Sequence, residues 1–281
     1  MDSVVEEKLY PDLPPTMVRG KEEKFKEADT SPFWSFLAKF IFLRLLKHRF
    51  CAFRYRGYED YIAAGGDSVP TIIFSVHSNW WDGLVLYHIA NFIMHREIRI
   101  MVEELNRMPI LRHAGAFSVN KKSAQSSMKA LQYAIKEACD TKNVLALFPQ
   151  GIIRPPHYRP IVFQTGLAYM AQGIVKKFGK VNLVPIAVDY KFLRDNRPEI
   201  LVTLSKPITL TDSKSDRKEL SHYLEKELEK ACEEQESIIS QGKIEDYKIL
   251  YRQIRWYRYY EQWIKRVDKK DLLKYNNKHK Q

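Results

Sequence analysis

Residues 71–82, TIIFSVHSNWWD, are the stretch that decides the fold. Its first half is an unbroken apolar run of the kind found in strands covered on both faces of a sheet. Similar runs recur along the chain, and helical patterns fill most of the gaps between them, notably at 123–139 and 164–177. The alternation predicts an α/β fold with a mixed, largely parallel β-sheet flanked by helices. The strands are expected at 52–56, 71–76, 98–102, 116–120, 144–148, 182–188 and 200–204.

The composition limits the class of protein. The chain has 281 residues, of which 45% are hydrophobic and 28% are charged, so neither wholesale disorder nor a polytopic membrane protein is expected. Lys and Arg total 46 against 34 Asp and Glu, a formal net charge of +12. This excess indicates an anionic partner, and nucleic acid, anionic lipid and phosphorylated substrates all qualify.

The cysteines indicate a reducing compartment. Cys51, Cys139 and Cys232 are odd in number and widely spaced, which favours neither a disulfide framework nor a zinc site. The N-terminus has neither the basic start nor the apolar stretch of a secretory signal, so we expect no export.

The chain divides into four predicted parts. Residues 1–30 carry three prolines and a charge cluster without apolar periodicity, and are expected to be a flexible lead-in. Residues 31–50 are expected to form an amphipathic, membrane-associating helix, with Ser31 as its N-cap and Pro32 at its first position. Residues 51–210 are the α/β domain. Residues 211–281 are expected to be a helical, basic C-terminal extension.

The helix at 33–50 has two interpretations, and the sequence leaves both open. It either lies in a membrane interface or packs on its own domain with snorkelling Lys and Arg. On a helical wheel it divides into a polar half with Ser35, Lys39, Arg44 and Lys47 and an apolar half with Trp34, Ile41, Phe42 and Leu45.

Helical spacing also appears twice after residue 211. Leu220, Leu224, Leu228 and Ala231 recur at that spacing, and so do Tyr247, Leu250, Tyr251, Ile254 and Tyr257. We expect these helices to dock on the α/β body. A basic, aromatic surface facing a membrane is the second interpretation.

His77 and Asp82 follow directly after the strand at 71–76. They would not share a face of one continuous helix, but they can meet if His77 lies in the loop and Asp82 lies in the first turn of the next helix. An ionised Asp82 can accept the proton on one imidazole nitrogen and leave the other nitrogen free as a general base. The pair is therefore the predicted catalytic site, at the carboxyl end of a strand where α/β sheets bind ligands.

Four ordered blocks make the chain similar to a known family. His77 and Asp82 match an H-x4-D block, residues 115–121 (GAFSVNK) resemble G-x-x-F-I-D-R, residues 148–151 (FPQG) resemble F-P-E-G, and residues 184–186 (VPI) resemble the fourth. On these blocks the sequence resembles the glycerolipid acyltransferase superfamily, the lysophosphatidic acid acyltransferase-like enzymes. Two positions depart from the pattern: Gln150 replaces a glutamate, and Lys121 stands where an arginine is usual.

The resemblance implies an O-acyltransferase that moves a fatty acyl group to a glycerolipid-type hydroxyl, with 1-acylglycerol 3-phosphate as the expected acceptor. It implies no cofactor, with acyl-CoA or acyl carrier protein as co-substrate, and no covalent enzyme intermediate. The expected substrate-binding residues are Asn120, Lys121, Gln150, Gly151 and Arg154. Lys121 can hold a phosphate as a point charge, but not in the bidentate fork of an arginine. Backbone amides near Gly151 are expected to stabilise the oxyanion.

The expected location is the cytoplasmic side of a membrane, with peripheral or monotopic attachment to anionic lipid. Two alternatives stay open. One is an O-acyltransferase acting on a glycolipid or another lipid alcohol. The other is a non-catalytic basic protein that binds membranes or nucleic acid, although no nucleic-acid partner is expected because the chain shows no recognised nucleic-acid module.

Overall fold

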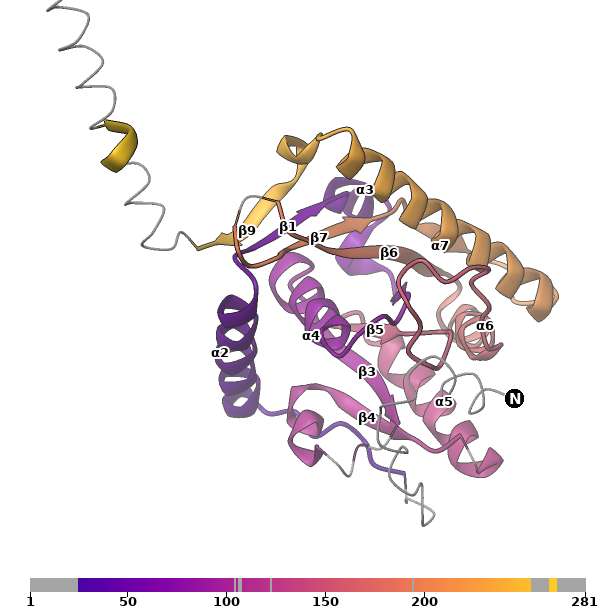
Figure 1. Ribbon diagram of the computed structural model, residues 1–281. Coiled ribbons are helices and arrows are strands. Elements are labelled where there is room, and N and C mark those ends of the chain that lie inside the picture. The colour runs from indigo at the N-terminus through magenta and orange to yellow at the C-terminus, as the bar shows by residue number, and fades with distance from the viewer. Residues whose placement is uncertain are drawn as a thin grey trace, which may run out of the picture.

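The computed structural model describes residues 25–103, 105, 108–121, 123–193, 195–253 and 263–266 (Figure 1). Within them, a nine-stranded sheet forms the centre of the protein, and its main order is β4-β3-β5-β2-β6-β7-β1-β9, with β8 also paired to β6. The strands are β1 Ala52–Arg56, β2 Thr71–Ser75, β3 Glu97–Glu103, β4 Ala116–Val119, β5 Asn143–Leu147, β6 Val181–Lys191, β7 Glu199–Leu204, β8 Ile208–Leu210 and β9 Lys248–Arg252.

The middle of the sheet is parallel. β2 pairs in parallel with β5 on one side and with β6 on the other, and β3 pairs in parallel with both β5 and β4. β7 and β8 both run antiparallel to β6, and β9 runs antiparallel to β1. The sheet is therefore mixed but mostly parallel, and the carboxyl ends of β2, β3, β4, β5 and β6 open on one edge.

Helices cover both faces of the sheet (Figure 1). The longer ones are α2 Pro32–Arg49, α4 Trp81–His88, α5 Ala124–Cys139, α6 Gly166–Phe178 and α7 Arg217–Ser240, with shorter α3 Tyr58–Ala63, η1 Gly66–Ser68, η2 Ile89–Ile93, η4 Pro109–Ala114 and η5 Ile244–Asp246. Alternate residues of β2 enter the two cores: Ile72 and Phe74 pack with α5, α6 and α7, while Ile73 packs with α2 and α4. This three-layer arrangement confirms the predicted α/β class.

The sequence located seven of these strands to within a few residues, but it missed two. β8 has only three residues and buries none of them, and β9 buries only Tyr251, so neither forms a long buried apolar run. The helix expected around residues 247–257 is wrong for its described part, because Lys248–Arg252 is a strand paired with β1. Ile254 and Tyr257 lie outside the described residues. The sheet thus takes a strand from the predicted C-terminal extension, whereas α7 is the helix expected there.

Of the N-terminal segment 1–30, only residues 25–30 are described. They run beside β4: the amide of Ser118 donates to the carbonyl of Lys26 at 2.9 Å, and the amide of Asp29 donates to the carbonyl of Arg112 at 3.0 Å. The expected flexible lead-in is therefore wrong for these residues, which cover the edge of the sheet.

The helix α2 packs on the body differently from the predicted wheel. Leu46 is buried, and Phe42 meets Tyr87 of α4 edge-to-face at 4.9 Å. The outward side of the helix is largely apolar, although the charged residue Arg44 is exposed there as well. Of the two interpretations left open by the sequence, packing on the domain describes one side of the helix, while the other side stays exposed and is largely apolar. The exposed large apolar residues of α2 are Phe33, Phe36, Phe40, Ile41 and Leu45.

Among the described residues, no helix has the length and apolar character needed to cross a membrane.

The buried imidazole of His88 gives a test of the core below α4. Its Nδ1 lies 2.7 Å from the carbonyl of Leu84, its ring stacks on Phe92, and its Nε2 has no hydrogen-bonding partner among the described residues. Burial, the main cause, lowers the pKa of His88 from 6.5 to about 4.

The unfolded chain therefore binds a proton at a pH where the folded chain does not. As the pH falls from about 6.5 to 4, we expect this group to remove up to about 3 kcal/mol from the free energy of unfolding. The measurement is urea unfolding of the native protein and His88→Leu across this range. The variant should lose less stability than the native protein on acidification, and parallel curves would contradict the assignment.

Candidate active site

His77 lies two residues beyond the end of β2, the central parallel strand. The loop after β5, its neighbour, begins at Phe148 and opens on the same edge of the sheet. Crevices outside the carboxyl ends of strands are the usual ligand sites of open α/β sheets. The fold thus brings together two of the sequence blocks that lie about seventy residues apart in the chain.

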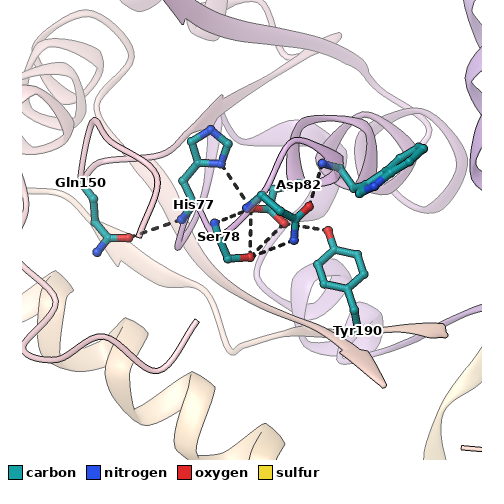
Figure 2. Close-up of polar contacts among 7 residues, drawn as sticks. His77, Ser78, Asp82, Gln150 and Tyr190 are labelled. Atoms are coloured by element: carbon teal, nitrogen blue, oxygen red, sulfur yellow. Dashed lines mark hydrogen bonds and ion pairs between the residues drawn. The ribbon is translucent and has the colours of Figure 1, made fainter. Parts of the chain in front are cut away.

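His77 and Asp82 meet as the sequence predicted (Figure 2). Nδ1 of His77 lies 3.2 Å from Oδ2 of Asp82. The carboxylate side chain is 1% exposed, whereas the imidazole side chain is 24% exposed. An acceptor at Nδ1 favours the tautomer with its proton on that nitrogen, which leaves a lone pair on Nε2.

The spacing of the two residues has a local cause. The side chain of Asn79 accepts from the amide of Trp81 at 2.8 Å, and Asp82 in return accepts from the amide of Asn79 at 2.9 Å. These two bonds span two and three residues, and they fold the residues just before α4 into a tight turn. His77 lies just before this turn, so the carboxylate of Asp82, which points back toward the turn, comes within reach of the imidazole of His77.

Asp82 has further donors around it. Its Oδ2 accepts from the amide of Ser78 at 2.6 Å, and its Oδ1 accepts from the hydroxyl of Tyr190 at 2.7 Å (Figure 2). Two backbone amides and a position in the first turn of a helix direct positive partial charges at the carboxylate oxygens. The arrangement supplies a buried negative charge next to an exposed imidazole.

The imidazole of His77 is also held by its face. Phe148 stacks on it with ring centroids 4.2 Å apart and planes 14° from parallel. The ring is therefore fixed by Asp82 at one nitrogen and by an apolar surface along one side, and this limits its rotation.

Gln150 contacts the backbone of the loop that carries His77. Its side chain is buried, and Oε1 accepts from the amide of His77 at 3.4 Å (Figure 2). The amide of Arg154 donates to the carbonyl of His77 at 2.8 Å. The turn after β5 is thus joined to the His77 loop by two hydrogen bonds, one at the amide of His77 and one at its carbonyl.

Gly151 closes a turn that no other residue would fit without strain. Its φ is +74°, and a Cβ built there would lie 2.6 Å from Nε2 of Gln164. Its amide donates to the carbonyl of Phe148 at 3.0 Å. Since the amide of Arg154 is used as well, the oxyanion donors expected near Gly151 are not these two groups.

Lys121 reaches the same turn from β4. Its Nζ donates to the carbonyl of Gly151 and forms an ion pair with Glu103 at 2.8 Å. The adjacent Asn120 uses its carbonyl to accept from the hydroxyl of Ser127 at 2.8 Å. The structure therefore places Lys121 beside the turn that carries Gln150, as expected for a group at the site, but with a carboxylate next to its charge.

The guanidinium of Arg154 lies over the ring of Tyr158, 4.6 Å from its centroid. The same loop is fastened to α7, because the amides of Ile161 and Phe163 donate to carboxylates of Glu229 at 2.7 Å and Glu225 at 2.6 Å. The C-terminal helix thus positions the loop that carries the predicted anion-binding residues.

The cysteines offer no nucleophile to this site. Burial, the main cause, raises the pKa of both Cys51 and Cys232 to about 11, so the thiols stay protonated. In the part of the chain that the structure describes, no cluster of three or more His, Cys, Asp or Glu side chains is arranged to hold a metal ion.

Comparison with known proteins assigns the family. Residues 53–189 match the family model described as Acyltransferase. This part of the chain is an acyltransferase domain. A search of curated proteins found no match. The resemblance predicted from the four blocks is thereby confirmed at the level of the glycerolipid acyltransferase superfamily, whose domain transfers acyl groups from a donor to a lipid acceptor.

The acyltransferase domain contains every site residue predicted from the sequence, namely His77, Asp82, Asn120, Lys121, Gln150, Gly151 and Arg154. Sequence reasoning missed the contacts made by Glu103, Phe148 and Tyr190. For Tyr190 the only signal is alternation along β6, which puts it on the same face as Ile186 and Val188. The alternation points to the site only once α4 is known to cover this face of the sheet.

The two residues of the pair should differ in their effect on stability. Removal of Asp82 leaves two buried amides and a tyrosine hydroxyl without their acceptor, so Asp82→Ala should lower the free energy of unfolding by about 2–4 kcal/mol. His77 is partly exposed, and His77→Ala should cost less than about 1 kcal/mol. Urea unfolding followed by circular dichroism measures both. Equal losses would show that the carboxylate does not organise the helix start.

Proposed function

We propose that the protein is an O-acyltransferase that moves a fatty acyl group from acyl-CoA or acyl carrier protein to a hydroxyl of a glycerolipid-type acceptor, with 1-acylglycerol 3-phosphate as the preferred acceptor. The observation that carries the proposal is the contact between Nδ1 of His77 and the buried carboxylate of Asp82. It is supported by the acyltransferase match across residues 53–189.

In the proposed reaction, His77 is the general base. Nε2 takes the proton from the acceptor hydroxyl as the oxygen approaches the thioester carbonyl carbon. The positive charge that develops on the imidazole is stabilised by Asp82, whose carboxylate is already desolvated and hydrogen-bonded.

The bond changes balance within the two substrates. A carbon–oxygen ester bond forms, the carbon–sulfur bond of the thioester breaks, and the proton held on Nε2 passes to the leaving thiolate. The transfer is direct, and no residue of the chain becomes acylated.

The acceptor is proposed to lie along the turn after β5, next to His77. Lys121 donates to the carbonyl of Gly151, and Arg154 follows in the same loop with its amide bonded to the carbonyl of His77. We propose that these two cations bind a phosphate by charge. Asn120 and Gln150 complete the proposed binding residues. Glu103 beside Lys121 reduces the local charge, and this favours testing an uncharged acceptor in parallel.

The decisive assay measures thiol release and the new lipid by mass spectrometry. Purified protein is incubated with palmitoyl-CoA or palmitoyl-acyl carrier protein and with lysophosphatidic acid, glycerol 3-phosphate or a lysoglycolipid. We expect product with lysophosphatidic acid, and at least about a thousandfold loss of turnover in His77→Ala with the fold retained. A folded His77→Ala that transfers acyl groups at the native rate would contradict the base assignment.

The acceptor panel also separates the alternatives. Lys121→Met should raise KM for lysophosphatidic acid more than for the lysoglycolipid if a phosphate lies against Lys121. A native enzyme that acylates only the lysoglycolipid would replace the phosphate acceptor by a neutral one. A chain that acylates nothing but still binds vesicles would be the non-catalytic alternative.

We also propose that α2 attaches the protein to the cytoplasmic side of a membrane, peripherally or as a monotopic anchor. What supports this is the outward face of α2, on which Phe33, Phe36 and Phe40 are 66%, 71% and 59% exposed. The last turn of the same helix is basic. Apolar side chains flanked by cations are the combination that binds an anionic lipid interface.

A neighbouring element extends this apolar surface. The indole of Trp34 in α2 stacks on the imidazole of His113 in η4, with ring centroids 4.6 Å apart. Met108 and Ile110, at the start of η4, are both exposed. Two elements packed together thus offer apolar side chains to the same environment.

Vesicle sedimentation tests the attachment. The double variant Phe36→Ser and Phe40→Ser should weaken binding to vesicles containing phosphatidylserine by at least about tenfold, because two large apolar side chains lose their contact with lipid. Tyr223→Ser is the control, since Tyr223 is an exposed aromatic residue of α7. Equal binding by the double variant and the control would refute the role of α2.

A further inference from the structure

The hydroxyl of Tyr190 donates to Oδ1 of Asp82 at 2.7 Å (Figure 2). Tyr190 comes from β6, more than one hundred residues after the H-x4-D block, and is reached only because β6 lies beside β2 in the sheet. It is a contact between the central sheet and the carboxylate that faces the proposed base.

The two oxygens of Asp82 have different partners. Oδ2 accepts from the amides of Ser78 and Asn79 and faces Nδ1 of His77. Oδ1 accepts from the hydroxyl of Tyr190 at 2.7 Å, and its contact with the Ser78 hydroxyl is longer, at 3.4 Å. Tyr190 is therefore the close donor that fixes the second oxygen, and with it the rotation of the carboxylate about its Cβ–Cγ bond.

The hydroxyl of Tyr190 is a permanent donor. Burial, followed by the charge of Asp82, raises the pKa of Tyr190 well above its ordinary value of 10.0. The residue as a whole is only partly buried, but its hydroxyl ends on a carboxylate that is 1% exposed. Across the pH range of a thioester assay the hydroxyl of Tyr190 stays neutral and remains the donor of its hydrogen bond to Asp82.

The ring of Tyr190 is held separately from its hydroxyl. It lies 5.3 Å from the ring of Phe50, which in turn meets Trp81 edge-to-face at 5.3 Å. A phenylalanine would keep these contacts. The hydroxyl is thus the only part of the side chain that these ring contacts do not require; it donates to Asp82 and also has a side-chain hydrogen bond with Asn79.

We propose that Tyr190 is a positioning residue of the active site, which acts on His77 through Asp82. This inference rests on the proposed function. A neutral donor on Oδ1 draws negative charge away from Oδ2, and it keeps the plane of the carboxylate aimed at the imidazole. It thereby sets both the orientation of the base and the pH at which the base loses its proton.

The test compares Tyr190→Phe with the native enzyme. We expect kcat to fall by at least about tenfold, because without its Oδ1 donor the carboxylate no longer holds the imidazole in the productive orientation, and this loss outweighs any gain in charge on Oδ2. KM for both substrates should stay nearly unchanged, because the hydroxyl touches Asp82 and no substrate. The acid limb of the pH–rate profile should move to higher pH by about half a unit or more, since a carboxylate that has lost a donor stabilises the imidazolium more strongly.

The control is Tyr247→Phe, which removes a buried tyrosine hydroxyl just before β9: that group lies 3.2 Å from the hydroxyl of Thr203 in β7. Both variants should lose a similar, small amount of stability in urea unfolding, but only Tyr190→Phe should alter kcat and the pH profile. Unchanged kcat and an unchanged profile in Tyr190→Phe would overturn the inference.

Coupling through Asp82 is tested in a double-mutant cycle. In an Asp82→Asn background, Tyr190→Phe should change kcat by less than about twofold, because the charge on which it acts is gone. A full additional tenfold loss in that background would show that Tyr190 acts by another route, and would overturn the inference.

A readout without turnover keeps the two proposals distinguishable. NMR titration of the histidine ring signals should show the His77 signal with a midpoint at higher pH in Tyr190→Phe than in the native protein and in Tyr247→Phe. If no thioester is consumed by the native protein, the proposed function fails, while the shift or constancy of this midpoint still decides whether Tyr190 acts on His77.

Discussion

The carboxylate of Asp82 is the group on which the rest of the site depends, because four polar groups from three parts of the structure meet it. Two amides at the start of α4, the imidazole beyond β2 and a hydroxyl from β6 all meet its two oxygens. An unpaired buried charge is costly, so this set of partners must form together or not at all. The same hydrogen bonds that begin the helix therefore also orient the imidazole. The contacts that start α4 are thus also the contacts that arrange the site for the proposed acyl transfer.

The remaining site residues mostly hold loops against one another. Gln150 bonds the amide of His77, Lys121 bonds the carbonyl of Gly151, and two carboxylates of α7 bond amides of the loop that follows. Each contact joins segments that are distant in the chain. The turn beside His77 is therefore rigid on the side of the sheet and α7. Some polar atoms of these residues already bond the protein backbone, so substrate groups would be bound by the atoms that remain accessible.

Much of the fold and half of the site followed from sequence patterns. Seven strands were recognised because each is a short apolar run, and the His77–Asp82 contact was recognised because a residue in the loop after a strand can meet a carboxylate in the first turn of the next helix. β9 was misread because Tyr247, Leu250 and Tyr251 have helical spacing, and only pairing with β1 makes them a strand. The face of α2 that packs on the domain was not predicted, because the wheel holds no information on what the helix meets.

By itself the sequence determined the α/β class, the order of the motifs and the local geometry that brings an acid to a base five residues away, since these depend on hydrogen bonds and apolar periodicity within short segments. Only the tertiary structure decided that Tyr190 meets Asp82, that Glu103 lies against Lys121 and that α7 holds the loop of Arg154. Such contacts depend on strand order and on which helix covers which face of the sheet. These are set by the packing of the whole core, and no single stretch of the chain encodes them.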